Sequence, residues 1–392
     1  MTLSRRLFIK RTLAFAGASA SFRIGFWNRH ASAEAAGERR RLVVVIMRGA
    51  VDALGLLAPV GDPAYTDMRT TLAFPRDRLL SLDDFYGLTP ALEPIHSWYK
   101  DGDLLLVPAV SSQYRDRSHF DGQSILESGL DDPTKVSSGW LGRIMKAHGE
   151  ELTAATVSGG IPTVLLGAPR IVNLPPPDVK VPGLDVVERL AKIYENDPAF
   201  ASFGDEIREA GRIGSVQVYG HPLIRAFNSV AEILARRDGA SIAIVNAGGW
   251  DTHSSQGTVD GRMFTAANVF ANGLKQLRET LGASAWRQTV VLGISEFGRT
   301  VRVNGSGGTD HGTGGFAFLA GGRVNGGQVY GEWPGLAERA LYQNRDLMPV
   351  TDVRSLIKGV LADFLQTPAK DIEETAFPNS RNVVAATDLF KA

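Results

Sequence analysis

Uninterrupted runs of apolar residues, most of them β-branched, are the feature that most constrains the fold of this chain. Residues 42–47 read Leu-Val-Val-Val-Ile-Met, with no polar side chain among them. A strand that is apolar on both faces is typical of a parallel sheet with a layer of structure on each side. We expect five further runs to be strands of the same sheet: Leu104 to Val110, Val164 to Leu166, Ile242 to Val245, Val290 to Ile294 and Phe316 to Leu319.

Helical patterns lie between these runs. In residues 264–281, apolar side chains recur on one helical face, and Gly282 follows as the predicted end of the helix. Strands that alternate with helices predict an α/β fold, here a three-layer α/β/α sandwich with a mostly parallel central sheet. Because ligands of such folds bind at the carboxyl ends of the strands, we expect the chemistry in the loops that follow the runs.

The N-terminus carries a targeting pattern. Residues 4–10, Ser-Arg-Arg-Leu-Phe-Ile-Lys, resemble a twin-arginine export signal; an apolar run, residues 12–22, and the small-residue pattern Ala31-Ser32-Ala33 follow. We predict that residues 1–33 are a cleaved signal peptide and that the twin-arginine translocase is a partner during export. The mature protein would then be periplasmic or extracellular. The alternative is an amphipathic helix that happens to contain two arginines.

Composition excludes several classes of function. Without residues 1–33, the chain keeps 36 basic and 42 acidic residues, a net charge of −6. A mildly acidic chain with scattered arginines argues against nucleic acid as a partner. The absence of cysteine excludes disulfides, thiolate metal sites and a cysteine nucleophile. No later segment reaches the roughly 18 apolar residues of a membrane span, so we expect no stable span in the mature chain.

Residues 34–392 are long enough for one large α/β domain with its own core. The pattern breaks at Pro175-Pro176-Pro177, and residues 174–238 show charged helical patterns without a convincing strand. We predict a helical insertion there. The alternative is that these helices simply cover one face of the sheet.

Four polar clusters follow predicted strands and hold three of the seven histidines of the chain. They are Arg117-Ser118-His119-Phe120-Asp121, Gly248-Gly249-Trp250-Asp251-Thr252-His253, Ser295-Glu296-Phe297-Gly298-Arg299-Thr300 and Thr309-Asp310-His311-Gly312. Imidazole nitrogens and carboxylate oxygens suit zinc, manganese, magnesium or calcium, and the residue types alone do not choose among these metals.

Each cluster also has an ordinary structural explanation. Ser118 and Asp121 have the spacing of a helix capping box, although a serine at a helix N-terminus is also suited to act as a nucleophile beside a bound phosphate. Asp251 and His253 would point to one side of an extended segment, which suits a shared metal or an ordinary hydrogen-bonded turn. Two further pairs have structural alternatives: Glu296 with Arg299 as a salt bridge, and Asp310 with His311 as a turn.

The clusters, taken in this order, resemble domain of unknown function 1501, a family of exported bacterial proteins that is similar in turn to the alkaline phosphatase and sulfatase superfamily. The segments that carry the resemblance are Leu42 to Asp52, Arg117 to Asp121, Gly139 to Arg143, Gly248 to His253, Ser295 to Thr300, Thr309 to Gly314, and Asn325-Gly326-Gly327 with Tyr330-Gly331. The resemblance implies an α/β sandwich with one or two metals, a nucleophile where Ser118 stands, and ligands where Asp251, His253 and His311 stand.

Some positions depart from the pattern of the superfamily. Ser295-Glu296-Phe297-Gly298 stands in the place of Ser-Asp-His-Gly, so Phe297 replaces a ligand histidine. Where the first strand should end in an aspartate ligand, Arg48-Gly49 comes first and Asp52 is the nearest acid. Clusters and resemblance together predict these ligands: Asp52, His119, Asp121, Asp251, His253, Glu296, Asp310 and His311.

Two functions compete on this basis. The first is an exported, metal-dependent hydrolase of phosphate or sulfate esters, in which Ser118 or a water attacks and Arg117 or Arg299 holds the anion. The second is a non-catalytic periplasmic binding or envelope protein on a degenerate hydrolase fold, which Phe297 and Arg48 favour. The second hypothesis predicts no stoichiometric metal.

Overall fold

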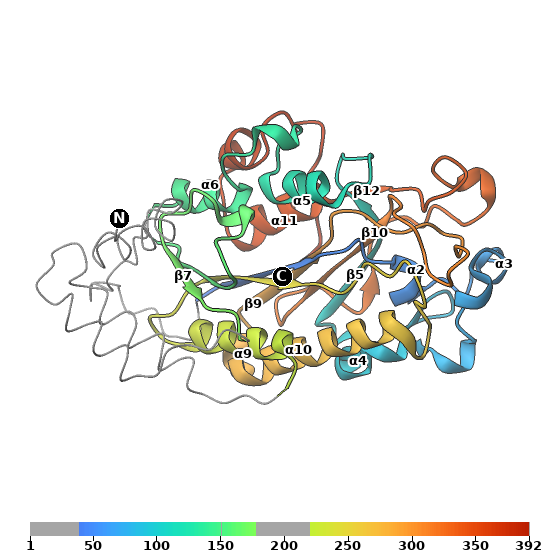
Figure 1. Cartoon of the computed structure of the whole chain (residues 1–392). Coiled ribbons are helices and arrows are strands. Elements are labelled where there is room, and N and C mark those ends of the chain that lie inside the picture. The colour runs from blue at the N-terminus through green and yellow to red at the C-terminus, as the bar shows by residue number, and fades with distance from the viewer. Residues whose placement is uncertain (1–38, 150, 178–219, 392) are drawn as a thin grey trace, which may run out of the picture.

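A nine-stranded mixed sheet runs through the centre of the molecule (Figure 1). The structure is a computed structural model that describes residues 39–149, 151–177 and 220–391. The strands follow the order β11-β5-β10-β9-β1-β8-β6-β7, and β12 pairs with β5. Their bounds are β1 Arg41–Met47, β5 Leu104–Ser111, β6 Ala154–Val157, β7 Ile171–Leu174, β8 Ile242–Ala247, β9 Thr289–Ile294, β10 Gly315–Ala320, β11 Gln328–Val329 and β12 Thr351–Asp352.

Strand direction decides which loops meet. The central strand β1 pairs in parallel with both β8 and β9, so the loops after these three strands leave from one edge of the sheet. By contrast, β10 is antiparallel to β9 and to β5. The segment that precedes β10 therefore arrives at the same edge at which β1, β8, β9 and β5 end.

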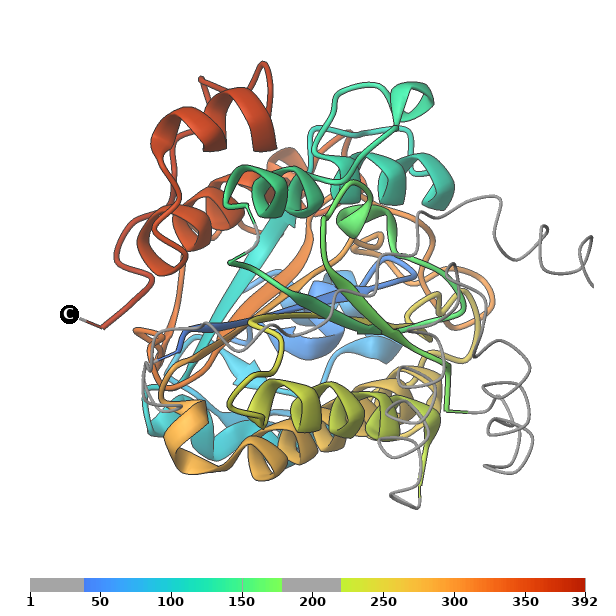
Figure 2. The ribbon, with the colours of Figure 1, turned by 90° about the vertical axis from the view of Figure 1, so that its left-hand side faces the viewer.

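Helices cover both faces of the sheet (Figures 1 and 2). On one face lie α4 (Glu93–Lys100), α9 (Pro222–Ala235) and α10 (Gly261–Trp286), and on the other α5 (His119–Ser128), α6 (Trp140–Ala147) and α11 (Val353–Gly359). Alternate residues of β1 feed the two cores: Val43 and Val45 pack on the α9–α10 side, Leu42 and Val44 on the α6–α11 side. The predicted three-layer sandwich with a mostly parallel sheet is confirmed.

Short elements complete the described part of the chain. A second, three-stranded sheet has the order β2-β4-β3. The bounds of its strands and of the remaining helices are β2 Leu57–Ala58, β3 Leu80–Ser81, β4 Gly87–Leu88, α2 Ala53–Leu56, α3 Tyr65–Arg69, the 3₁₀ turns Thr70–Leu72, Arg76–Arg78, Pro90–Leu92, Pro133–Lys135, Thr163–Leu165 and Glu338–Ala340, and the π-helical turns Val360–Phe364 and Asp371–Ala376.

One predicted strand is wrong. Val164 to Leu166 lies in a 3₁₀ turn, Thr163–Leu165, and not in the sheet. Its apolar side chains are buried beneath α6, and the Val164 N–H donates to Glu127 Oε2 at 3.2 Å instead of to a strand. A run of three apolar residues after a proline has too few side chains to distinguish a buried turn from a short strand. The other five runs are strands.

The long helix α10 departs from its predicted end. The chain has a non-helical conformation at Gly282, with φ of 73°, but resumes a final turn that reaches Trp286. Only glycine adopts this left-handed conformation without a steric penalty, so Gly282 makes a kink rather than a stop.

The predicted domain boundaries lie mostly outside the described residues. This holds for the signal peptide, residues 1–33, and for residues 178–219 of the predicted insertion. The described end of that insertion, α9, packs on α10 and against β6 and β8. Within the described ranges, no helix has both the length and the apolar character needed to cross a bilayer.

Candidate metal centre

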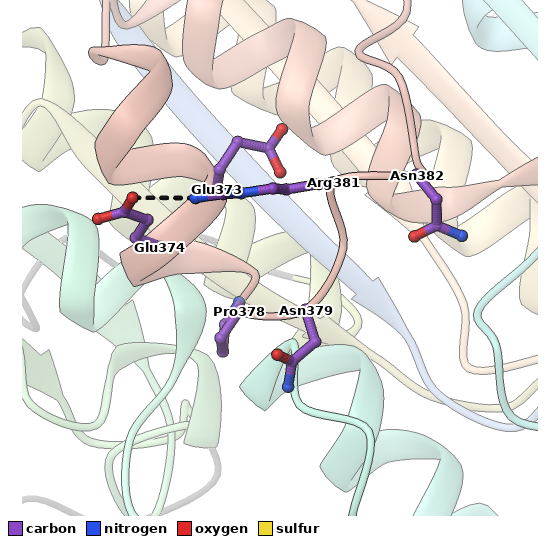
Figure 3. A pocket seen from close by; sticks show the side chains of 6 residues that line it. All are labelled: Glu373, Glu374, Pro378, Asn379, Arg381 and Asn382. Carbon is purple, nitrogen blue, oxygen red and sulfur yellow. Dashed lines mark hydrogen bonds and ion pairs between the residues drawn. The ribbon is translucent and has the colours of Figure 1, made fainter.

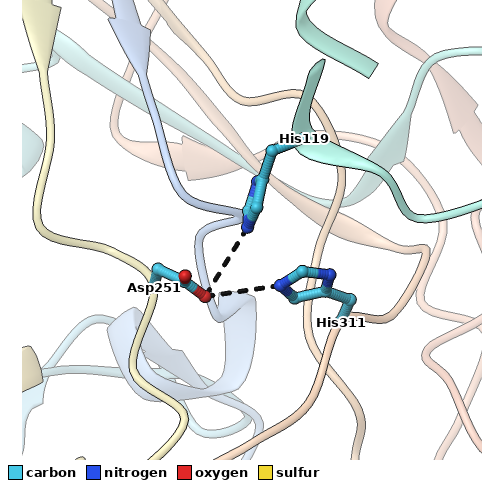
Figure 4. Close-up of side chains that lie close together, drawn as sticks. All are labelled: His119, Asp251 and His311. Atoms are coloured by element: carbon cyan, nitrogen blue, oxygen red, sulfur yellow. Dashed lines mark ion pairs between the residues drawn. The ribbon is translucent and has the colours of Figure 1, made fainter. Parts of the chain in front are cut away.

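Three side chains from distant parts of the chain meet at the edge where β1, β8 and β9 end (Figure 4). His119 is the first residue of α5, Asp251 follows β8, and His311 precedes β10. One ligand atom from each lies within 4.8 Å of the others. The antiparallel direction of β10 explains why His311 reaches this edge from the start of a strand rather than from its end.

A single carboxylate oxygen is the focus of the group. Asp251 Oδ1 lies 3.6 Å from His119 Nε2 and 3.4 Å from His311 Nε2. A third histidine, His253, brings its Nε2 to 3.0 Å from the same oxygen. His253 Nε2 also lies 3.0 Å from His311 Nε2. The structure thus brings four of the eight predicted ligands together.

Each of the three imidazoles is held from behind through its other nitrogen. The contacts are His119 Nδ1 to Glu296 Oε1 at 2.7 Å, His253 Nδ1 to Asp310 Oδ1 at 3.4 Å, and His311 Nδ1 to the Arg117 carbonyl oxygen at 2.8 Å. A carboxylate or a carbonyl can only accept, so in every case Nδ1 donates. The Nε2 atoms are therefore directed to the common centre, in the arrangement by which metal-binding histidines are oriented.

The pair of His119 and Glu296 is electrostatically strong. Glu296 is fully buried, and burial acts to raise its pKa, but hydrogen bonds from His119 and from the Gly49 N–H outweigh burial and leave the pKa below its ordinary value. The hydrogen bond to Glu296 in turn raises the pKa of His119. Glu296 therefore supports a ligand as an ionised carboxylate rather than facing the centre itself.

The pKa values of Asp251 and His311 are both lowered, which favours the charged form of Asp251 and the neutral form of His311. Burial acts to raise the pKa of Asp251, yet the hydrogen bond and charge of Arg299 lower it overall, so the carboxylate is ionised. Burial lowers the pKa of His311 and favours its neutral form. An ionised carboxylate beside a neutral imidazole is the protonation state that a divalent cation requires of its ligands.

Arg299 holds Asp251 from the side opposite to solvent. Its side chain is 0% exposed, whereas that of Asp251 is 48% exposed. Besides Asp251 Oδ1, the guanidinium donates to His253 Nε2 and to four backbone carbonyl oxygens, those of Gly49, Ala50, Trp250 and Thr309. All three of its nitrogens are thus committed to protein acceptors.

The donor set fits a cation. His119 Nε2 is buried and has no hydrogen-bond partner. Because Nδ1 donates in His253 and in His311, the Nε2 atom of each ring carries its lone pair, and the two Nε2 atoms lie only 3.0 Å apart. Facing nitrogen lone pairs repel one another unless a proton or a cation lies between them. Three imidazoles and one carboxylate suit zinc or another borderline metal better than the oxygen-rich sites of magnesium and calcium.

On the inner side of the centre, the backbone of Gly49 lies close to the backbone of Asp251. Gly49 has φ of 119°, and a Cβ there would lie 2.7 Å from the Asp251 backbone nitrogen. Phe297, which stands in place of a ligand histidine, is buried and stacks on the His119 ring with centroids 5.1 Å apart. The Phe297 ring therefore packs against a predicted ligand and cannot itself bind a metal.

The other predicted ligands lie behind or away from the centre. Asp310 and Glu296 are partners of His253 and His119. Asp52 caps α2 and forms a buried ion pair with Arg69 at 2.5 Å. The structure does not place Asp52 with the four side chains that meet.

The predicted catalytic residues surround the first turn of α5. Asp121 lies 3.4 Å from the Tyr114 hydroxyl, away from His119, because residues two apart on a helix point in different directions. Ser118 is the N-cap residue, but its side chain makes no capping hydrogen bond, so the capping box is not formed. The Arg117 guanidinium pairs with Asp346 at 2.8 Å, and only its carbonyl faces the centre.

Sequence reasoning missed a row of supporting side chains on α5. His119, Gln123 and Glu127 are spaced four residues apart, so they lie on one helical face. Gln123 donates to Glu296 at 3.2 Å, and Arg48, at the end of β1, donates to both Gln123 and Glu127. This spacing in the sequence was the available signal that α5 faces the end of β1.

A separate pocket of about 590 Å³ opens near the C-terminus (Figure 3). It is lined by Glu373, Glu374, Pro378, Asn379, Arg381 and Asn382. Glu374 pairs with Arg381 at 3.2 Å, and Glu373 pairs with the buried Lys358 at 2.8 Å. Both acidic side chains are already balanced by cations, and we assign no ligand to this pocket.

The second half of the chain carries the family match. Residues 217–375 match the family described as Protein of unknown function (DUF1501). This chain carries a DUF1501 segment. The predicted resemblance is thereby confirmed. The DUF1501 segment contains Asp251, His253 and His311, whereas His119 lies before it. No curated protein sequence matches the chain.

Several solved structures are similar to this chain at low identity. A protein in the alkaline phosphatase superfamily from Vibrio parahaemolyticus is 14% identical, with a TM-score of 0.37 over 72% of this chain and 60% of that one. The C-terminal periplasmic domain of EcEptC from Escherichia coli, in complex with Zn, is 12% identical, with a TM-score of 0.37 over 73% and 74%. Murine ectonucleotide pyrophosphatase / phosphodiesterase 5, inactive and in complex with AMP, is 11% identical, with a TM-score of 0.32 over 67% and 57%.

Proposed function

We propose that this protein is an exported, metal-dependent hydrolase of phosphate or sulfate esters. The observation that carries the proposal is the convergence of three Nε2 atoms on Asp251 Oδ1, each imidazole being held at Nδ1 by an acceptor. His119, Asp251 and His311 would hold the metal, with His253 as the adjoining fourth donor. A divalent ion held there polarises an ester oxygen and lowers the pKa of a neighbouring water or hydroxyl.

The protein supplies orientation around that ion. Glu296, Asp310 and the Arg117 carbonyl each hold one imidazole, so the centre is preorganised. Arg299 holds the Asp251 carboxylate and, being fully buried, acts on this ligand rather than on the anion in our proposal. Ser118 immediately precedes His119 at the start of α5 and is the side chain we propose as nucleophile, with water as the alternative.

The first test is the metal content of the full chain, purified after export. We expect about one divalent ion per chain by elemental analysis, and loss of the ion in the Asp251→Ala, His311→Ala double variant. His96→Ala is the matched control, because His96 lies on α4, on the other face of the sheet, where it contacts the Ser81 carbonyl. This control should keep the ion.

Turnover is then measured with chromogenic aryl phosphates and aryl sulfates. We expect His311→Ala to lower kcat/KM at least about a hundredfold. Substitution of a residue that only orients a metal ligand can already lower activity by up to about a hundredfold, and His311 is itself a proposed ligand. Ser118→Ala should abolish turnover if the serine attacks and spare it if water does. Full activity in both variants would exclude this site as the catalytic centre.

The binding-protein alternative has one observation in its favour. The Arg299 guanidinium already neutralises Asp251, so the carboxylate has a permanent cation beside it. A wild-type protein that binds no metal and hydrolyses none of the esters would favour a non-catalytic periplasmic binding or envelope protein on this fold.

A further inference from the structure

The segment 341–347 braces the loop that carries His311. The Leu347 carbonyl oxygen accepts from the Gly314 N–H at 3.0 Å, and Arg345 donates to the His311 carbonyl oxygen at 2.5 Å. Asp346 forms a bridge to Thr300 in the loop after β9. One short segment therefore touches both chain stretches that flank the centre.

Arg117 connects this brace to the His311 ring. Its backbone has φ of 61°, a left-handed conformation that a residue with a side chain adopts only at a cost in free energy. In that conformation its carbonyl oxygen accepts from His311 Nδ1 at 2.8 Å. The orientation of the ring thus depends on a strained turn that something must hold in place.

Asp346 is what holds the turn. Its Oδ2 accepts from Arg117 Nε at 2.9 Å and from Arg117 Nη2 at 2.8 Å. Asp346 is fully buried and the Arg117 side chain is 19% exposed, so the carboxylate of this ion pair is shielded from solvent and the contact is fixed in direction. Arg345 also lies near this carboxylate, with its Nε 3.5 Å from Asp346 Oδ1.

We propose that Asp346 is a positioning residue for His311 and acts through Arg117. The ion pair holds Arg117 in its left-handed turn, the turn aims the Arg117 carbonyl at His311 Nδ1, and the hydrogen bond keeps the proton on Nδ1 and the lone pair of Nε2 toward Asp251. The proposal rests on the metal site of the proposed function. Asp346 itself is not a ligand, and it follows His311 by 35 residues in the sequence.

The test compares wild type with Asp346→Asn in the full chain. Long-range ¹H–¹⁵N spectra of the metal-free protein report the tautomer of His311, whose signals are assigned with a His311→Gln variant. We expect the Nδ1-protonated form in wild type and a mixture of tautomers in Asp346→Asn. Calorimetric titration with Zn²⁺ should show affinity reduced about ten- to a hundredfold.

A second variant and a control separate positioning from folding. Arg117→Lys keeps the charge but not the two-nitrogen contact, so its loss of Zn²⁺ affinity should be smaller than that of Arg117→Ala. Glu373→Gln breaks an ion pair of similar kind, with the buried Lys358, and should lower stability without changing the tautomer of His311 or the Zn²⁺ affinity.

The outcomes are distinct. If Asp346→Asn keeps the wild-type tautomer and the wild-type Zn²⁺ affinity, Asp346 is structural only and the inference is wrong. If the wild type binds no Zn²⁺, the proposed function fails, while the tautomer comparison still decides whether Asp346 positions His311.

Discussion

At the scale of single residues, the centre depends on which atom of a side chain faces inward. Residue types identified His119, Asp251, His253 and His311 as ligands, and the structure places these four together. The same reasoning assigned Glu296 as a ligand, yet its carboxylate lies behind His119. A glutamate or aspartate can bind a metal or orient a histidine, and the residue type is the same in both cases. Only the direction of the side chain in the structure distinguishes the two roles.

Arg299 offers the sharpest single-residue test. Arg299→Lys keeps one positive charge but cannot donate to Asp251, His253 and four carbonyl oxygens at once. We expect Zn²⁺ affinity to fall at least about tenfold, because Asp251 loses the group that aims it. We also expect the free energy of unfolding to fall by about 1–3 kcal/mol, because buried carbonyl oxygens are left without a donor.

The control for Arg299 lies three residues further on. Arg302 is half-exposed and pairs at the surface with Glu338 at 3.3 Å. Arg302→Lys should therefore change neither the free energy of Zn²⁺ binding nor the free energy of unfolding by more than about 0.5 kcal/mol. Unchanged Zn²⁺ affinity in Arg299→Lys, measured by the same titration, would show that Asp251 is positioned without the guanidinium.

At the scale of elements, the partly buried Arg143 and the buried Lys358 join helices that are distant in sequence. Arg143 of α6 donates to the Ser128 carbonyl at the end of α5, and to those of Thr375 and Ala376. Lys358 of α11 donates to both oxygens of Glu373 and to the carbonyl oxygens of Ser380 and Val383. These contacts satisfy carbonyl groups that helix ends and turns leave unpaired.

Removing the buried lysine should loosen the C-terminal helical turns. Lys358→Met should lower the free energy of unfolding by about 3 kcal/mol, because Glu373 is left without its cation and two buried carbonyls lose a donor. Urea unfolding followed by circular dichroism measures the change. Lys135→Met, at an exposed pair with Asp132, should cost less than about 1 kcal/mol. Equal losses in the two variants would contradict a specific role for burial.

The elements that the sequence predicts best are those buried on both faces. Strands such as β1 and β9 show unbroken apolar runs because each residue faces one of two cores. Strand β6 and the edge strand β7 have four residues each, and β7 is largely half-buried, so neither has a run long enough to recognise. Val164 to Leu166 was misassigned for the opposite reason, since a buried turn can be as apolar as a strand.

At the scale of the whole molecule, a metal would link three regions that only folding brings together. His119, Asp251 and His311 come from the start of α5, the loop after β8 and the loop before β10. An ion that binds only the folded state should therefore stabilise the entire chain. At a free Zn²⁺ concentration one hundred times Kd, the expected gain in unfolding free energy is about 2.7 kcal/mol.

Thermal unfolding with and without Zn²⁺ measures this gain. Tm should rise with Zn²⁺, return to its starting value on addition of a chelator, and stay unchanged in Asp251→Ala. The same rise in wild type and in Asp251→Ala would mean that the ion binds elsewhere.

The antiparallel strand β10 also determines when the centre can exist during synthesis. It occupies the gap between β9 and β5, and the residue that it brings, His311, enters just before the strand. A nascent chain that ends before His311 leaves both neighbouring strands with an open edge and lacks one of the predicted donors. A metal could therefore bind this centre only after more than three quarters of the polypeptide has emerged from the ribosome.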